Sequence, residues 1–351
     1  MRPSRRNATM KKFFMALFQC GATALLLWWV FRDEGKRHAL NDALHQAKWW
    51  WIAAGVGAYG LFEILAGIRW QILLRVQGVH LSWSRLYGLL MVGLFFSLFI
   101  PGGTGGDLIK GYYLLKEAPV GRKTSAALSV VMDRLLGLLG VGILTVGITS
   151  FRWDWLMSDP VSKHCVYTVL GILAVSVSGM LLAGLVSGLR LVHALPEKLP
   201  GRNFLASLSG AYALYARAWF PTLCAILISV LAHVAHYTTF WCAARSLDDS
   251  GPRKPSAVEL YSALPVIEGA AAIPITPGGL GTREMLFDQM LTPLADLEPN
   301  VAPTISVLGY LCIAFWGAVG GAFYIFYRPS RTQRRAIRAE TVAQFQGTRL
   351  G

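Results

Sequence analysis

Six long apolar runs constrain this chain more than any other feature of its sequence. They cover residues 13–31, 49–74, 124–150, 165–187, 221–244 and 302–327. A helix needs about 20 residues to cross the hydrocarbon core of a bilayer, and every run is close to or above that length. Charged residues make up only 15% of the chain, whereas a soluble domain carries about 25%. The sequence therefore predicts an all-α, polytopic membrane protein with about six full spans.

Two shorter apolar segments, residues 86–100 and 258–276, interrupt this series. Each runs into a Pro-Gly-Gly turn, "PGGTGGDLIK" in the first case and "PGGLGTREML" in the second. Proline ends a helix and glycine permits positive φ, so each turn predicts a helix break. Non-helical backbone at membrane depth is tolerated only inside protein or beside a wet cavity. We therefore expect two re-entrant helical hairpins, and their similar motifs suggest inverted repeats.

The distribution of charge predicts the orientation. The net charge is +14, and with both short segments re-entrant, Lys and Arg accumulate on one side, which the positive-inside rule assigns to the cytoplasm. We expect a basic cytoplasmic N-terminus at residues 1–12, a transmembrane domain at 13–327 and a basic cytoplasmic tail at 328–351. The expected location is the bacterial inner membrane. The basic residues act as an orientation signal, and nucleic acid is not an expected partner.

The first glycine motif is a candidate binding site for an anion. A helix that begins after a glycine turn presents free backbone N–H groups and the positive end of its dipole. Asp107 and Lys110 share one face of that helix. The functional interpretation is a phosphate headgroup bound by backbone N–H groups and Lys110, while Asp107 orients the lysine or contacts a cation. The alternative is that Asp107 merely caps the helix. The candidate glycines are Gly102, Gly103, Gly105 and Gly106.

The second glycine motif repeats this pattern. Arg283 and Glu284 lie in the first turn of the helix that it opens. Arginine suits bidentate contacts with phosphate, so this motif is a second candidate for headgroup binding. The alternative is an arginine at the membrane surface that extends to water. The candidate glycines here are Gly278, Gly279 and Gly281.

Several charged residues fall inside the apolar segments. Charges at such depth are costly and usually face a cavity or a partner. Glu63, Asp133, Arg134 and Glu268 are of this kind, and for each of them a partner on another helix and a direct role in substrate binding both stay open. Arg69 lies close to the cytoplasmic end of its span, where we expect it to extend toward the surface.

His233 and His236 form an H-x-x-H pair on one helix face. Two histidines can ligate a metal, but the sequence offers no third ligand nearby. Hydrogen bonding between helices is the favoured interpretation, and a proton relay stays open. The five cysteines are isolated, and Walker and H-E-x-x-H motifs are absent. No metal and no cofactor are predicted.

Four motifs occur together in a characteristic order: "RW" at residues 69–70, "PGGTGGDLIKGYYL", "DRLLGL" and "TPGGLGTRE". Over residues 13–330 the chain resembles the lysylphosphatidylglycerol synthase transmembrane-region family, also called flippase-like or UPF0104. Lys110 departs from the pattern, because family members commonly carry arginine there. The resemblance implies a helical membrane domain with two re-entrant hairpins that moves lipids between leaflets. The namesake proteins continue into a soluble aminoacyl-transferase domain. Here only a basic tail follows Arg328, so synthase activity is not expected.

The favoured hypothesis is a lipid translocase, a flippase or transporter rather than an enzyme. Its substrate would be a membrane phospholipid or lipid-linked compound with an anionic or zwitterionic headgroup. Lys110 and Arg283 would contact the phosphate. Two alternatives are an integral-membrane transferase that acts on a lipid-linked substrate and a non-catalytic scaffold for envelope biosynthesis. A lipid-modifying enzyme is the candidate protein partner. The acids of the site would orient these cations, balance their charge or carry coupled protons. They are Asp107, Asp133, Glu268 and Glu284.

Overall fold

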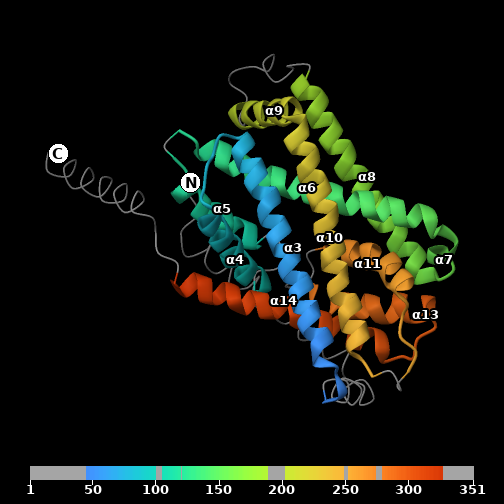
Figure 1. Cartoon of the computed structure of the whole chain (residues 1–351). Coiled ribbons are helices and arrows are strands. Elements are labelled where there is room, and N and C mark those ends of the chain that lie inside the picture. Colours follow the sequence, from blue (N-terminus) through green and yellow to red (C-terminus); the bar gives the residue numbers. More distant parts are fainter. Residues whose placement is uncertain are drawn as a thin grey trace, which may run out of the picture.

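The computed structural model describes residues 45–99, 105–119, 121–188, 202–248, 252–273 and 279–326, and the regular structure in these ranges is helical (Figure 1). Five helices are long and apolar enough to cross a membrane. They are α3 (Trp49–Val76), α6 (Lys123–Phe151), α8 (Pro160–Gly188), α10 (Trp219–Ser246) and α14 (Val301–Phe326). Five of the six predicted spans are thereby confirmed, and the sixth, residues 13–31, lies outside the described residues. The chain is a polytopic helical membrane protein.

Shorter helices fill the intervals between these spans. They are α4 (Trp83–Phe99), α5 (Gly105–Glu117), α7 (Trp153–Met157), α9 (Arg202–Arg217), α11 (Ala257–Ala271), α12 (Thr282–Leu286), the π-helical turn η3 (Phe287–Leu291) and α13 (Thr292–Leu294). Helices α4 and α5 pack against each other, and α11 packs against α12 and η3. New helices begin at Gly105 and Thr282, as the two glycine motifs predict. The re-entrant course of both hairpins and their inverted-repeat relation stay predictions.

A glycine allows the first hairpin to close. A Cβ atom added to Gly106 would lie 2.0 Å from the Ser97 hydroxyl oxygen and 2.2 Å from the carbonyl oxygen of Gly93. The Ser97 hydroxyl donates to that same carbonyl at 3.1 Å. Small residues let membrane helices approach this closely. Gly106 therefore has a packing role in holding α5 against α4.

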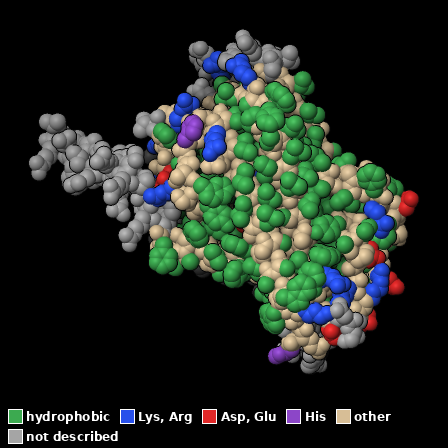
Figure 2. All heavy atoms as spheres, in the orientation of Figure 1, with side chains coloured by type: hydrophobic (Ala, Val, Ile, Leu, Met, Phe, Trp, Pro, Cys, Tyr) green, Lys and Arg blue, Asp and Glu red, His purple; other side chains and the backbone are tan. Residues whose placement is uncertain are grey.

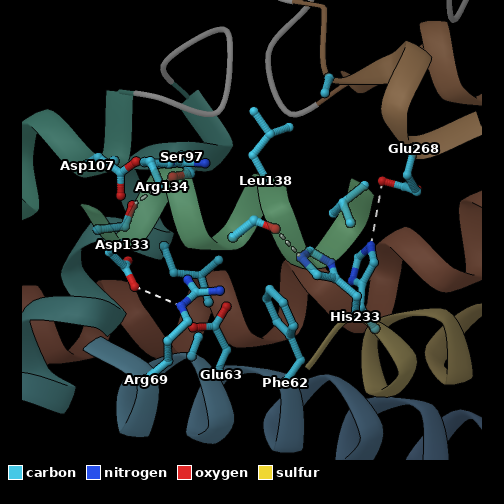
Figure 3. A pocket seen from close by; sticks show the side chains of 18 of the residues that line it. Phe62, Glu63, Arg69, Ser97, Asp107, Asp133, Arg134, Leu138, His233 and Glu268 are labelled. Carbon is cyan, nitrogen blue, oxygen red and sulfur yellow. Dashed lines mark hydrogen bonds and ion pairs between the residues drawn. The ribbon is translucent and has the colours of Figure 1, made fainter. Parts of the chain in front are cut away.

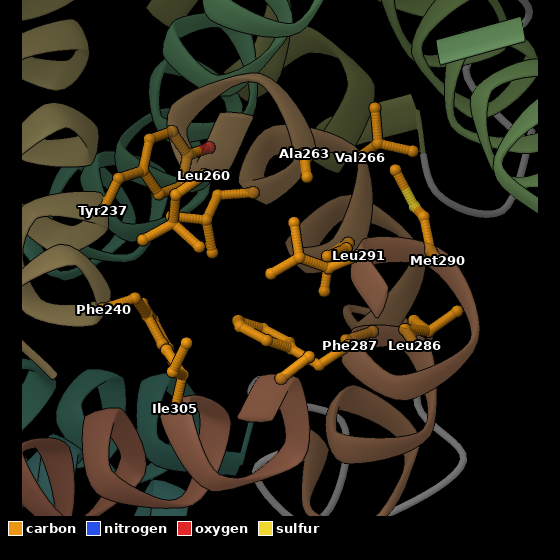
Figure 4. Close-up of a cluster of buried hydrophobic side chains, with 14 of the residues drawn as sticks. Tyr237, Phe240, Leu260, Ala263, Val266, Leu286, Phe287, Met290, Leu291 and Ile305 are labelled. Atoms are coloured by element: carbon orange, nitrogen blue, oxygen red, sulfur yellow. The ribbon is translucent and has the colours of Figure 1, made fainter. Parts of the chain in front are cut away.

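The second hairpin is built around left-handed glycines and a packed apolar cluster. Gly279 and Gly281 have φ values of 73° and 83°, which other residues adopt only with strain. Figure 4 shows Phe287 and Leu291 of this segment packed with Phe240 of α10 and with side chains of α11 and α14. These contacts hold α12 and η3 between three longer helices.

The outer surface of the bundle is apolar over its middle. Figure 2 shows hydrophobic side chains covering the centre of one face, with most Lys and Arg side chains toward its ends. Helix α8 is the least buried of the five candidate spans, and its exposed apolar side chains include Val175, Leu181, Leu182 and Leu185. Such a face is unsuited to water and suits contact with acyl chains.

Candidate functional site

A cavity of about 620 Å³ lies inside the bundle, and both hairpins contribute to its wall. This volume is within the range of ordinary small-molecule sites, about 300–1,000 Å³. Gly106 and Lys110 of the first hairpin line it, as do Glu268 and Ala272 of the second, while the remaining wall comes from spans α3, α6, α8 and α10. Its larger aliphatic and phenylalanine side chains are Phe62, Leu90, Leu94, Leu135, Leu138, Val141, Val169, Ile172 and Leu173.

Five charged residues gather at one side of this cavity, and we call them the cationic cluster: Arg69, Lys110 and Arg134 with Asp107 and Asp133. The Asp133 carboxylate accepts from Arg69 Nε at 2.8 Å and from Lys110 Nζ at 3.2 Å. Lys110 Nζ also lies 3.2 Å from the Asp107 carboxylate, which pairs in addition with Arg134. Three helices, α3, α5 and α6, are joined by these contacts. Of the two alternatives left open for Asp133 and Arg134, partners on other helices are therefore observed, and a direct role in substrate binding stays a prediction.

Further contacts fix the two buried cations of this cluster. Arg69 Nη1 donates to the Ser229 hydroxyl on α10 at 3.0 Å. Lys110 Nζ lies 4.4 Å from the centre of the Trp70 ring, which adds a cation–π contact. Arg69 is 8% exposed, so the expectation that it extends to the membrane surface is wrong. Its partner Asp133 is 64 residues away in sequence, and no local pattern joins the two.

A second group of charged and polar residues lies at the opposite side, and we call it the glutamate cluster: Glu268, Glu284, Arg283, His236 and Ser306. Arg283 lies 3.7 Å from Glu268 and 3.6 Å from Glu284, measured between the nearest nitrogen and oxygen atoms. The Ser306 hydroxyl donates to Glu284 at 3.0 Å and accepts from Arg283 Nε at 3.3 Å. His236 Nε2 lies 3.6 Å from Glu268. This cluster joins α10, α11, α12 and α14.

Arg283 is buried within the protein, at 3% exposure, so the alternative of an arginine at the membrane surface is wrong. Its guanidinium lies 5.0 Å from the centre of the Tyr310 ring and 5.3 Å from that of Phe240. Glu284 also accepts from the backbone N–H of Gly281 at 2.6 Å, which caps α12. These contacts show that Arg283 and Glu284 of the second motif pack behind the cavity wall. Glu268, which contacts Arg283, lines the cavity itself.

The structure brings together some of the predicted site residues and separates others. Those that line the cavity are Gly106, Asp107, Lys110, Asp133, Arg134 and Glu268. Those described elsewhere are Gly105, Gly279, Gly281, Arg283 and Glu284. Those outside the described residues are Gly102, Gly103 and Gly278.

Both histidines of the H-x-x-H pair line the cavity, and Figure 3 shows His233 there. His233 Nε2 donates to the carbonyl of Gly137 on α6 at 3.3 Å, and His236 contacts Glu268 on α11. The predicted contacts between helices are confirmed. Glu63, by contrast, forms no ion pair within 4.0 Å among the described residues, and it lines the cavity, so a direct role in substrate binding stays open for it. In Figure 3 it lies between the cationic cluster and the histidines.

Comparison with known proteins places this architecture in a family. The family model described as "Lysylphosphatidylglycerol synthase TM region" matches residues 16–321. A UPF0104 membrane protein of Pyrococcus horikoshii is 21% identical over 191 residues, and the chain spans about half of that relative's length, 54%. A UPF0104 membrane protein of Methanocaldococcus jannaschii is 22% identical over 275 residues, which are 72% of this chain and 76% of the relative. No solved structure matches. The match of the family model to most of its length shows that the chain belongs to the lysylphosphatidylglycerol synthase TM region family.

Proposed function

We propose that this protein moves lipids with an anionic or zwitterionic headgroup between the two leaflets of a membrane. The observation that carries the proposal is the cationic cluster, which faces a cavity of about 620 Å³ inside a bundle of apolar spans. Charges at such depth are expensive, and they usually mark a substrate or ion pathway. A polar headgroup needs such a pathway to cross, because the hydrocarbon core offers it no hydrogen bonds.

The charge of the cluster suits a phosphate diester. Three cations, Arg69, Lys110 and Arg134, face two carboxylates, Asp107 and Asp133, so the cluster carries one formal positive charge. A phosphate diester carries one negative charge and would neutralise this excess. Lys110 is central, because its ammonium group lies 3.2 Å from each of two carboxylates and can exchange one of them for a phosphate oxygen.

The walls of the cavity suit the remainder of a lipid. Most lining side chains other than the two clusters are apolar, and α8, which contributes Val169, Ile172 and Leu173, presents its outer face to lipid. The headgroup would occupy the cavity while the acyl chains stay in the bilayer. Membership of a family of transmembrane regions supports a role within the membrane. Both relatives named above are archaeal, so placement in a bacterial inner membrane with cytoplasmic termini stays a prediction based on charge.

Headgroup translocation in reconstituted liposomes tests the proposal. The liposomes contain fluorescent phosphatidylglycerol, and dithionite added outside quenches the lipid that reaches the outer leaflet. Charge-assisted hydrogen bonds contribute about 1.5–3 kcal/mol each, so Lys110→Met should slow translocation about tenfold or more. Lys110→Glu should abolish it. The matched control is Lys116→Glu, on the exposed face of the same helix, which should keep the rate. If both Lys110 variants translocate the lipid at the wild-type rate, the proposal is wrong.

A further inference from the structure

Glu63 is the one acid among the described cavity-lining residues that lacks a cation within ion-pair distance. It lies near the middle of the 28-residue helix α3, about 20 Å from either end at 1.5 Å per residue. The residue is 6% exposed. No lysine, arginine or histidine nitrogen in the described ranges comes within 4.0 Å of its carboxylate. Glu63 is therefore buried and has no protein cation in direct contact with its carboxylate among the described residues.

The cations nearest to Glu63 already have partners. Arg69 contacts Asp133 and donates to Ser229, and Lys110 lies between two carboxylates. Figure 3 shows the Glu63 side chain beside Arg69 and pointing into the cavity. Tyr59, one turn earlier on the same face of α3, interacts with the carboxylate. A hydroxyl can solvate a carboxylate in part, but it supplies no positive charge.

The titratable and charged groups around Glu63 come from six of the described helices around the cavity, and the seventh, α8, contributes only apolar side chains. Helix α3 presents Tyr59 and Arg69, α4 presents Tyr87, α5 presents Asp107 and Lys110, and α6 presents Asp133 and Arg134. The far side carries His233, His236 and Tyr237 on α10 and Glu268 on α11. Glu268 contacts His236 and Arg283, which leaves Glu63 as the cavity-lining acid without a cation in ion-pair contact among the described residues.

An ionised carboxylate in this position is costly. Burial of an unpaired charge costs several kcal/mol even after relaxation, and the group avoids that cost by binding a proton. The carboxylate takes up one proton from hydronium in solution and becomes a neutral carboxylic acid, and the hydronium O–H bond that breaks leaves a water molecule. We propose that Glu63 is a proton-binding site and that its protonation is linked to the binding of an anionic headgroup at the cationic cluster.

Charge explains the link. The cationic cluster has one formal positive charge in excess, and an ionised Glu63 on the same cavity wall would cancel it. A protonated Glu63 leaves the excess available to a phosphate. Protonation should therefore favour the anion, and the anion should favour protonation by the same factor, because linkage is reciprocal. The proton site stands on the cavity geometry alone, whereas its link to cargo rests on the proposed function.

Infrared spectroscopy of the purified protein tests the proton site without any lipid cargo. A protonated carboxyl has a carbonyl stretch distinct from that of a carboxylate. At pH 7 the wild type should show this band, and Glu63→Gln should lose it. Glu259→Gln, which removes an acid outside the cavity, should keep it. Glu63→Asp retains a carboxyl and should show a titrating band, which keeps the test valid if the glutamine variant folds poorly. Absence of the band in the wild type at pH 7, or its persistence in Glu63→Gln, contradicts the proposal.

Calorimetric titration with a short-chain phosphatidylglycerol tests the link. Above the pH at which Glu63 ionises, wild-type affinity should fall by up to about tenfold per pH unit, because one proton is coupled to binding. Glu63→Gln mimics the neutral acid and should bind equally well across this range. Parallel pH profiles of the two proteins refute the link. So does a wild-type affinity that follows the sodium concentration at fixed pH, which would make Glu63 a metal-cation site. A carboxyl band in a protein that moves no lipid contradicts the proposed function but supports the proton site.

Discussion

Replacement of Asp133 by asparagine tests how the cationic cluster is held together. Asp133 is 4% exposed and serves two cations, Arg69 at 2.8 Å and Lys110 at 3.2 Å. Asparagine has nearly the same volume, so little packing is lost, but its amide carries no charge. After the change, Lys110 keeps Asp107 and Arg69 keeps the Ser229 hydroxyl.

The expected cost follows from the buried charges that remain. Breaking a buried ion pair by removal of one partner costs about 3–5 kcal/mol, since the other charge stays buried and uncompensated. Each of the two cations here keeps one other contact, so we expect the lower end, about 3 kcal/mol. The matched control is Asp154→Asn in the short helix α7, where an exposed acid should change stability by about 0.5 kcal/mol or less.

Reversible unfolding in mixed detergent and SDS micelles, followed by circular dichroism, measures these differences. The double variant Asp133→Asn with Lys110→Met should recover part of the loss, because it removes one of the two uncompensated cations. Coupling between residues in one network is typically about 0.5–3 kcal/mol. If Asp133→Asn is as stable as Asp154→Asn, or if the two changes in the cluster are simply additive, Asp133 is not the shared counter-charge.

Two further predictions concern the hairpins. Gly106→Ala should destabilise the protein by about 1–3 kcal/mol through overpacking and reduce translocation, because the added methyl meets Ser97 and the Gly93 carbonyl. Gly111→Ala on the same helix, with open space at that position, should do neither, and equal thermal stability of the two variants would contradict the packing. At the start of α11, outside the spans, burial raises the pKa of Glu259, but hydrogen bonds with Ser256 and Arg253 outweigh it and hold that pKa below the ordinary value. Its stabilising contribution should be complete above the unfolded pKa, about 4.3, and disappear as the pH falls through the lowered folded value. The stability difference between wild type and Glu259→Gln should shrink over that acid range, and a constant difference would contradict these contacts.

The sequence was sufficient to predict most of the architecture. Apolar length predicts five of the observed spans, and the glycine motifs predict helix starts at Gly105 and Thr282. These predictions succeed because length and local backbone chemistry determine them. The cost of a buried charge likewise predicts that Asp133 and Arg134 find partners on other helices.

The arrangement of the cavity could not be predicted in this way. Helical periodicity tells which residues share a face, but it does not tell which helix packs against that face. Arg69 therefore looked like a surface residue, although Asp133 and Ser229 hold it inside. The same limit hid the contact of His236 with Glu268 and the position of Arg283 behind the cavity. For Glu63 the sequence could not show that an ion-pair partner is lacking, because this becomes clear only when the partners of every nearby cation are known.

Photo-crosslinking with two lipid probes tests most directly whether a headgroup enters the cavity. One phosphatidylglycerol probe carries a diazirine on its headgroup and the other carries it at the end of an acyl chain, and mass spectrometry locates the labelled peptides. The headgroup probe should label cavity-lining segments of α5 and α6, such as those with Gly106 and Leu138, and Lys110→Met should reduce that labelling. The acyl-chain probe should label the exposed face of α8, where Val175 and Leu181 lie. Headgroup labelling confined to the ends of the spans, and unchanged in Lys110→Met, would contradict the proposed passage of lipid headgroups through this cavity.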